Sequence, residues 1–417
     1  MKVKTFRMLG VLCLVGASCA ESNPEPLNLE SCASIAATCR AAGRACVPAS
    51  GDESALCVQC PEGKHPAGPW AQCAPIQGNK LSHDFGDVTL KAGQELDGVC
   101  QSWVVGNTET LYVNAVEMVS DGGYHHSNWF FVPAEVAEER GYKSGAWKNC
   151  YKKGFHEIDA ATAGGVIFAQ STQVKREVQK FQDGAVVRVP PNVWIMGSTH
   201  LLNVYPEARD IHLSLHLYTV PADEVSVELT PFRLSYLDLE IPAQSTVEFS
   251  TTCDMEKVFD GQFNHPFDVK MHYMLPHYHS LGAGFQVRVV GGEKDGLLIQ
   301  DFDGFGSDPF GRVFDPPVAF PGATGLSYTC AFQNPGDKTI GWGIGDQEMC
   351  VLLGFMESPV AFDATVIDGD VLGWEDETIK HEGECFVYGF EYEPGGTPAL
   401  GASPSADSPD PSDDSKK

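Results

Sequence analysis

The segment Asp210-Ile-His-Leu-Ser-Leu-His-Leu-Tyr-Thr219 is a short, apolar, strand-forming stretch with turn signals around it. Segments of the same kind, such as residues 109–116 and 285–290, recur through the middle of the chain, and no long amphipathic helix stands out among them. Short strands separated by turns are typical of β-sandwiches and barrels. We therefore expect an all-β protein.

Length and composition divide the 417 residues into five regions. The β-rich middle is long enough for two tandem, jelly-roll-like β-sandwich domains. A small disulfide-rich module precedes them, and a tail rich in Gly, Pro, Ser, Ala and Asp, which we expect to be disordered, follows them. The expected boundaries are 1–20 for a signal peptide, 21–75 for the Cys-rich module, 76–208 and 209–393 for the two sandwiches, and 394–417 for the tail.

The first twenty residues predict export. They combine a basic start, a short apolar core and small residues before Glu21, which is the pattern of a secretory signal. The apolar core is about half of the ~20 residues that a membrane-spanning helix needs. Gly16-Ala-Ser-Cys19 resembles a bacterial lipoprotein processing site, so a lipidated Cys19 would attach the protein to the cell envelope. Cleavage after Ala20, which would release a secreted protein, is the alternative.

The net charge of −28, from 56 acidic and 28 basic side chains, argues against binding to nucleic acid or to anionic membrane surfaces. No Ser, Cys or Asp motif of a hydrolase is present, which disfavours nucleophilic hydrolysis. The charge itself identifies no substrate and is most simply explained by solubility.

Fourteen cysteines are present, and twelve remain when Cys13 and Cys19 of the signal region are set aside. An even number in an exported chain predicts about six disulfides. Six of the twelve fall between residues 32 and 73, a segment too short to build its own apolar core. Zinc binding by Cys57-Val-Gln-Cys60 is the competing interpretation, which an oxidising compartment disfavours.

Two pairs of histidines and one methionine are candidate metal ligands. Adjacent strand residues face opposite sides, so His125 and His126 could meet one ion only at a bend or strand end, and two structural histidines are the alternative. His277 and His279, two residues apart, project from the same side of a strand and can chelate one ion. A methionine such as Met349 usually packs in a core, but a thioether beside two imidazoles would favour Cu(I) over zinc.

Together these stretches resemble the copper- and ascorbate-dependent monooxygenases typified by peptidylglycine α-hydroxylating monooxygenase and dopamine β-monooxygenase. In that family a His-His pair and a later His bind one copper, and a His-x-His pair and a Met in a Glu-Met-Cys context bind the other. Here the same motifs occur in the same order, and the resemblance covers roughly residues 80–393. It implies one copper at His125, His126 and a third histidine, and another at His277, His279 and Met349.

The third histidine should lie between the two pairs, in a strand resembling His-Tyr-x-Asn. His200-Leu-Leu-Asn203 fits this pattern, with Leu201 in place of the aromatic residue. His212 and His216 are the rivals. The resemblance also implies three disulfides, each contributing about 3–4 kcal/mol through the unfolded state: Cys100–Cys150, Cys330–Cys350 and Cys253–Cys385.

The implied activity is hydroxylation of a C–H bond with O2 and a reductant such as ascorbate. Oxygen would bind at the copper of His277, His279 and Met349, and the other copper would store an electron. A non-catalytic, copper-sequestering surface lipoprotein is the alternative function. A structural or adhesive sandwich with incidental histidines is a third possibility.

The substrate is the least determined feature. Peptide-amidating members have an Arg two residues before the His-x-His pair, and an Asn and a Tyr two and four residues after the Met. Here Leu275, Val351 and Leu353 occupy those positions, so no cation is available there to pair with a carboxylate. A peptidylglycine substrate is therefore disfavoured, and we expect a small, less polar one.

Overall fold

The computed structural model describes most of the chain between the signal region and the tail. The expected signal peptide, with Cys19, and the expected tail lie outside the described residues. No helix within the described part is both long enough and apolar enough to cross a membrane. The described residues are 32–41, 43–48, 54–171, 173–303, 311–343 and 346–393.

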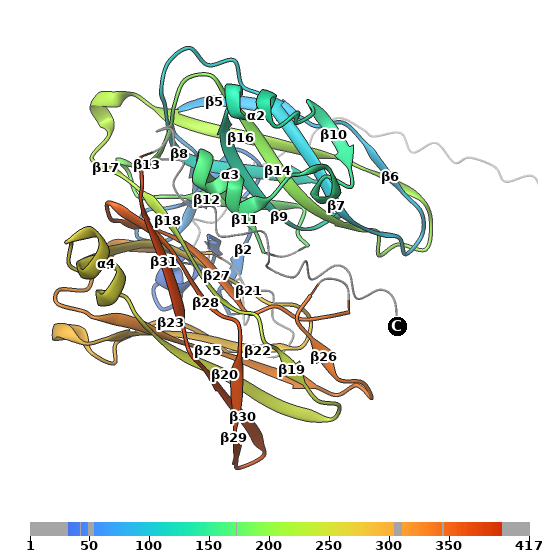
Figure 1. The fold of residues 1–417 in the computed structure, drawn as a ribbon. Helices are drawn as coiled ribbons and strands as arrows, with labels where there is room; N and C mark the ends of the chain where they lie inside the picture. Colours follow the sequence, from blue (N-terminus) through green and yellow to red (C-terminus); the bar gives the residue numbers. More distant parts are fainter. Residues whose placement is uncertain are drawn as a thin grey trace, which may run out of the picture.

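The described residues form an all-β structure with two sandwiches, as expected from the sequence (Figure 1). The first sandwich, upper in Figure 1, packs a five-stranded sheet on a six-stranded one around a core of large apolar side chains. The five-stranded sheet runs β10 (Gly145–Lys148), β7 (Glu95–Val104), β14 (Val193–Leu202), β9 (Tyr124–Pro133) and β11 (Gly165–Gln170). The other contains β17 (Val227–Glu228), β13 (Ala185–Val189), β8 (Leu111–Ser120), β16 (Leu213–Val220) and β5 (Asn79–Asp84), with β12 (Arg176–Lys180) also paired to β8.

Short elements complete the first sandwich. The pair β6 (Val88–Leu90) and β15 (Arg209–Ile211) forms a small ribbon. Three helical segments lie between strands, and each is shorter than eight residues, which agrees with the lack of a long amphipathic pattern. They are α2 (Ala134–Glu139), the 3₁₀ turn η2 (Tyr151–Lys153) and α3 (Glu157–Ala163).

The second sandwich packs two six-stranded sheets around its own core. One sheet runs β24 (Arg312–Ala319), β21 (Lys270–His277), β27 (Val351–Glu357), β18 (Thr230–Tyr236), β28 (Val360–Val366) and β31 (Phe386–Glu391). The other runs β23 (Leu298–Asp303), β22 (Gly282–Val290), β25 (Gly325–Asn334), β20 (Ser245–Asp254), β30 (Thr378–Gly383) and β29 (Gly369–Glu375). The remaining elements are the pair β19 (Glu240–Ile241) and β26 (Ile340–Gly341), the helix α4 (Glu256–Phe263) and the 3₁₀ turns η3 (Ala222–Glu224) and η4 (Gly292–Lys294).

The boundary between the sandwiches differs from the expected one at residue 208. Strand β16 pairs with β5 and β8, and β17 pairs with β13, so residues 209–228 belong to the first sandwich. The second sandwich begins at β18, which pairs with β27 and β28. The sequence of β16 does not reveal its sheet, because its partners β5 and β8 lie more than ninety residues earlier in the chain.

All six predicted disulfides form within the described residues. The three implied pairings are confirmed at Cys100–Cys150, Cys253–Cys385 and Cys330–Cys350. In the Cys-rich module, Cys57 and Cys60 join different partners, so the zinc interpretation of that pair is wrong. The three disulfides of the module are Cys32–Cys46, Cys39–Cys57 and Cys60–Cys73.

The Cys-rich module contacts both sandwiches. Its elements are α1 (Ala36–Ala41), the pair β1 (Ala45–Val47) and β2 (Leu56–Val58), and the pair β3 (Lys64–Ala67) and β4 (Gln72–Pro75). Helix α1 packs on β24 of the second sandwich. Arg176 of the first sandwich donates a 2.7 Å hydrogen bond to the carbonyl of Cys60. The module therefore bridges the two sandwiches rather than standing apart as a spacer.

The two sandwiches share a buried apolar contact. Phe181 of the first sandwich lies against Tyr273 and Phe355 of the second, with ring centroids 6.0 and 5.1 Å apart. Gln182 donates a 2.7 Å hydrogen bond across the same interface to the carbonyl of Phe314. This contact fixes the edge at which the candidate ligands of the two sandwiches meet.

Candidate metal centre

Strand β9 carries His125 and His126 at a β-bulge. In the register with β14, His200 pairs with His126 and Leu201 pairs with Tyr124, so His125 is the extra residue. A bulge breaks the alternation of side-chain directions, which removes the objection that adjacent strand residues face opposite sides. The rings of His125 and His126 both lie near His200, with centroids 5.1 and 4.7 Å from it.

His200 is the third histidine that joins this pair. Its Nδ1 lies 2.9 Å from Nε2 of His126, and its side chain is buried. The two rivals lie elsewhere: His212 contacts Asp87, and His216 contacts Ser82.

The second pair of histidines lies at the end of β21. His277 is the last residue of the strand, whereas His279 follows it in the turn before β22. The expectation that both project from one strand face is therefore wrong in detail. The backbone N–H of His279 instead donates a 2.7 Å hydrogen bond to the carboxylate of Glu348, which ends the strand ladder there. The rings of His277 and His279 remain neighbours, with centroids 5.2 Å apart.

The segment that carries Met349 lies directly against His279. The carbonyl oxygen of Gln347 is 2.7 Å from Nδ1 of His279. The buried carboxylate of Glu348 accepts hydrogen bonds from the backbone N–H groups of His279, Leu281 and Met349, at 2.7, 2.7 and 3.3 Å. Glu348 thus ties the methionine segment to the His-x-His turn.

The histidines of the two sandwiches face each other across the interface. The ring of His126 lies 5.0 Å from that of His277, and the ring of His125 lies 5.7 Å from that of His279. Candidate ligand nitrogens of His126, His277 and His279 all lie within 4.8 Å of one another. The histidines of the two ligand sets expected from the sequence are therefore not separate in this structure but form one cluster. We call His125, His126, His200, His277 and His279 the five-histidine cluster.

Backbone carbonyls orient both histidines of the second sandwich. Nδ1 of His277 donates to the carbonyl of Ser171 at 3.0 Å, and Nδ1 of His279 donates to that of Gln347 at 2.7 Å. A proton on Nδ1 leaves the lone pair on Nε2 available to bind a metal. Within the described residues, these two buried Nε2 atoms have no hydrogen-bond partner.

Burial keeps the imidazoles neutral. It lowers the pKa of His126 and of His277 well below the usual value, and neighbouring histidines lower both further. Burial also lowers the pKa of His200 to about 3 and that of His279 to about 4. Neutral imidazole is the form that coordinates a metal. These four histidines therefore present neutral imidazoles at neutral pH.

Two polar side chains of the first sandwich hold its histidines. Nε2 of His200 lies 2.6 Å from Oε1 of Glu95, and because His200 is neutral this contact is a hydrogen bond from N–H to carboxylate. Nδ1 of His125 lies 3.3 Å from Oε1 of Gln173. A carboxylate or carbonyl behind an imidazole fixes its tautomer and ring plane. Of these supporting residues, only Glu348 has a local signal in the sequence, its place in Glu-Met-Cys.

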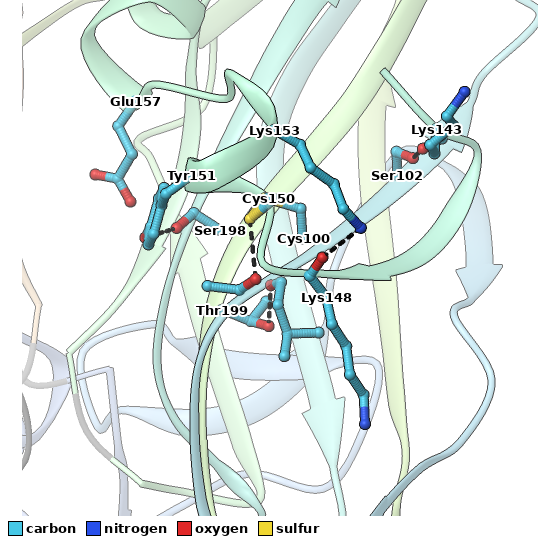
Figure 2. The surroundings of a disulfide bond; sticks show 12 residues. Cys100, Ser102, Lys143, Lys148, Cys150, Tyr151, Lys153, Glu157, Ser198 and Thr199 are labelled. Carbon is cyan, nitrogen blue, oxygen red and sulfur yellow. Dashed lines mark hydrogen bonds between the residues drawn. A yellow bond between two sulfur atoms is a disulfide. The ribbon is translucent and has the colours of Figure 1, made fainter. Parts of the chain in front are cut away.

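The Cys100–Cys150 disulfide braces the strand that carries His200. Figure 2 shows the segment after Cys150 lying against β14, with Tyr151 pointing at Ser198. Thr199, next to His200, donates a 2.6 Å hydrogen bond to the carbonyl of Val99, and the N–H of Cys150 donates to that of Gly98. The disulfide and these bonds hold β7 and β14 together beside the cluster.

The three apolar positions that replace polar residues of peptide-amidating enzymes lie beside the cluster. Val351 pairs with His277 between β27 and β21, and Leu353 pairs with Leu275. Leu275 is buried, and both leucines pack against the core of the first sandwich. A cavity of about 570 Å³ lies elsewhere, beside the turn of the β29–β30 hairpin, and no histidine lines it.

The histidines of the cluster fit a metal ion such as copper or zinc. Imidazole accepts both copper and zinc, whereas a thioether is a soft ligand that favours Cu(I). Two buried, unpartnered imidazole nitrogens next to the methionine segment are the feature that a metal would satisfy.

Comparisons with known proteins assign no family. No protein-family model matches the sequence, and no curated protein matches it significantly. A structure of infectious bursal disease virus Gx strain is similar over 67% of this chain and 71% of the viral chain, with 11% identity and a TM-score of 0.18. The mavirus penton protein matches 68% of this chain and 100% of its own, with 6% identity and a TM-score of 0.10. At these TM-scores the likeness carries no functional argument.

Proposed function

We propose that this protein is a copper-dependent monooxygenase of the ascorbate-using family, exported through an oxidising compartment, that hydroxylates a C–H bond of a small substrate. The observation that carries the proposal is the pair of buried Nε2 atoms of His277 and His279, which have no partner among the described residues, beside three further histidines. An unsatisfied buried nitrogen costs about 1–3 kcal/mol, so two of them in one place indicate a site made for a ligand. Six disulfides agree with export.

Copper bound here would supply the one-electron steps and the oxygen activation that hydroxylation requires. His277 and His279 would be held for it by the carbonyls of Ser171 and Gln347, and Glu348 would keep Met349 next to them. His125, His126 and His200 would bind the electron-storing copper, with Glu95 behind His200.

The apolar residues beside the cluster support a substrate without a carboxylate. Leu275, Val351 and Leu353 offer neither a cation nor a hydrogen-bonding side chain where peptide-amidating enzymes bind the peptide terminus. Glycine-extended peptides are therefore expected not to be substrates of the copper-loaded protein. Efficient amidation would overturn this part of the proposal.

The direct test of the activity is oxygen uptake by the copper-loaded, full-length protein with ascorbate and a panel of small apolar substrates. We expect substrate-dependent consumption of ascorbate and one hydroxylated product per O2. The matched control is Met349→Leu, which keeps volume but removes the thioether. Equal turnover by this variant would contradict the assignment of Met349.

Copper sequestration without turnover is the alternative function. It is favoured by the close approach of the two histidine sets, whose rings lie 5.0–5.9 Å apart across the interface and leave little room between them. Tight binding of two coppers without ascorbate consumption for any substrate would support sequestration.

A further inference from the structure

His126 occupies the junction of the two expected ligand sets. Its ring centroid is 4.7 Å from that of His200 in its own sandwich, and 5.0 and 5.9 Å from those of His277 and His279 in the other. One candidate ligand nitrogen from each of His126, His277 and His279 lies within 4.8 Å of the other two. That group takes one residue from the first set and two from the second, so it matches neither set.

The interface itself orients this mixed group. Ser171, of the first sandwich, accepts the Nδ1 proton of His277, of the second, and donates from its hydroxyl to the carbonyl of Pro276 at 2.8 Å. The first sandwich therefore fixes a ligand of the second, because Ser171 holds His277, whose ring faces that of His126. His279 is held within its own sandwich by Gln347.

We propose that the first metal ion that the protein takes up is bound by His126, His277 and His279, and thereby ties the two sandwiches together. This inference rests on the metal-binding part of the proposed function, but not on turnover. Two ligands about 2.0–2.1 Å from one tetrahedral ion lie about 3.3 Å apart, so the 4.8 Å group needs only a small contraction. Three neutral imidazoles accept Co²⁺ and Zn²⁺ as well as copper, so the site can be probed without redox chemistry.

Single variants distinguish a first ion bound by the mixed group from a first ion bound by His277, His279 and Met349. If the first ion used His277, His279 and Met349, His126→Ala would not affect it and Met349→Leu would weaken it. If the first ion uses the mixed group, the outcomes reverse. His125→Ala is the matched control, because it removes the neighbouring imidazole on the same bulge but not a member of the group.

The experiment is titration of the metal-free, full-length, disulfide-intact protein with Co²⁺, followed by its visible absorption and by competition with a chelator. We expect His126→Ala and His277→Ala each to weaken the first equivalent at least tenfold, with His125→Ala and Met349→Leu within twofold of wild type. First-equivalent affinity of His126→Ala within twofold of wild type would overturn the proposal. Near-UV circular dichroism checks that each variant is folded.

A second measurement needs no variant. A crystal of the wild-type protein with one equivalent of Co²⁺ is expected to give one anomalous peak bonded to His126, His277 and His279. A peak bonded instead to His125 and His200, or to Met349, would overturn the proposal. Either result is independent of ascorbate turnover, so failure of this inference and failure of the proposed function are distinguishable.

Discussion

Two buried polar clusters differ in whether all of their polar atoms have hydrogen-bond partners. In the first, Glu117 accepts bonds from Arg176 at 2.6 Å, from the N–H of Gly63 at 2.8 Å and from the hydroxyl of Tyr218 at 2.6 Å. Arg176 in turn donates to carbonyls of the Cys-rich module, including that of Cys60. In the second, the five-histidine cluster, backbone carbonyls occupy one nitrogen of His277 and of His279 and leave the other without a partner.

The difference separates the cluster of Glu117, Arg176 and Tyr218, which we call the anchor and which stabilises the fold, from a cluster that is suited to bind a ligand. Burial raises the pKa of Glu117, but the hydrogen bonds it accepts and the charge of Arg176 outweigh burial and lower it. Each charged or polar side chain around Glu117 therefore has a hydrogen-bond or ion-pair partner within the protein. In the histidine cluster burial lowers the pKa of His126, His200, His277 and His279, and the hydrogen bonds to the carbonyls of Ser171 and Gln347 do not outweigh it, so neutral nitrogens remain for a ligand. We expect substitutions in the anchor to change folding and substitutions in the cluster to change metal binding.

The largest expected effect is that of Arg176→Met. It leaves the carboxylate of Glu117, which is fully buried, without its cation, and breaking a buried ion pair in this way costs about 3–5 kcal/mol. We expect a matching fall in the denaturant midpoint measured by circular dichroism, with metal uptake unchanged under native conditions. The double variant Glu117→Gln/Arg176→Met should recover part of the loss. Loss of metal binding by folded Arg176→Met would contradict the distinction between the anchor and the metal-binding cluster.

Glu177 tests whether an unpaired buried atom is enough to make a site. Its Oε2 is buried without a partner among the described residues, and burial raises its pKa to about 8. The folded state therefore retains a proton that the unfolded state releases above about pH 4.5, so stability falls as pH rises from about 4.5 to 8.

The change Glu177→Gln should remove about 2–4 kcal/mol of this pH dependence, at about 1.4 kcal/mol per unit of pKa shift, without affecting metal affinity. Denaturation midpoints at pH 5 and pH 8 measure it, with the exposed Glu377→Gln as control. An unchanged pH dependence would contradict the role assigned to Glu177.

Glu348 is expected to affect both folding and metal binding. Its two carboxylate oxygens accept three backbone hydrogen bonds, and an amide can accept on only one of its atoms. We expect Glu348→Gln to cost about 1–3 kcal/mol of stability and to weaken metal binding as well, because the Met349 segment loses its tie to His279. Metal titration of the folded variant and its denaturation midpoint separate the two losses. Unaltered metal affinity would show that Glu348 does not position His279.

Glu95 is expected to give the smallest effect on folding. Its side chain is 38% exposed and contacts His200, so Glu95→Gln should change stability by less than about 0.5 kcal/mol. Because it orients a ligand imidazole, the same change should weaken copper binding at His125, His126 and His200 about tenfold. Glu109→Gln, an exposed glutamate away from the cluster, is the control for titrations by copper. Equal affinities would contradict a positioning role.

The sequence predicted the fold class and the disulfides because both depend on local or countable features. Alternating short strands indicate sandwiches, and the spacing of Cys330 and Cys350 points to one bridge. It predicted the wrong domain boundary because β16 is defined by partners far away in the chain.

The sequence named the five histidines that the structure brings together, but it did not predict their arrangement. Adjacent strand residues such as His125 and His126 normally face opposite sides, and the bulge is what lets both approach His200. The residues Tyr124–Ser127 give no local signal of that bulge. The carbonyl that orients His277 comes from Ser171 in the other sandwich. Because it is a backbone group, any residue type at that position could supply it. The merging of the two ligand sets depends on how the sandwiches pack, which motif spacing does not encode.

The most direct test of the central claim is anomalous diffraction at the copper edge from crystals of the full-length protein soaked with excess Cu(I). We predict two copper peaks within the five-histidine cluster, one of them within bonding distance of the sulfur of Met349. Copper bound only outside that cluster, or no copper at all, would contradict the claim.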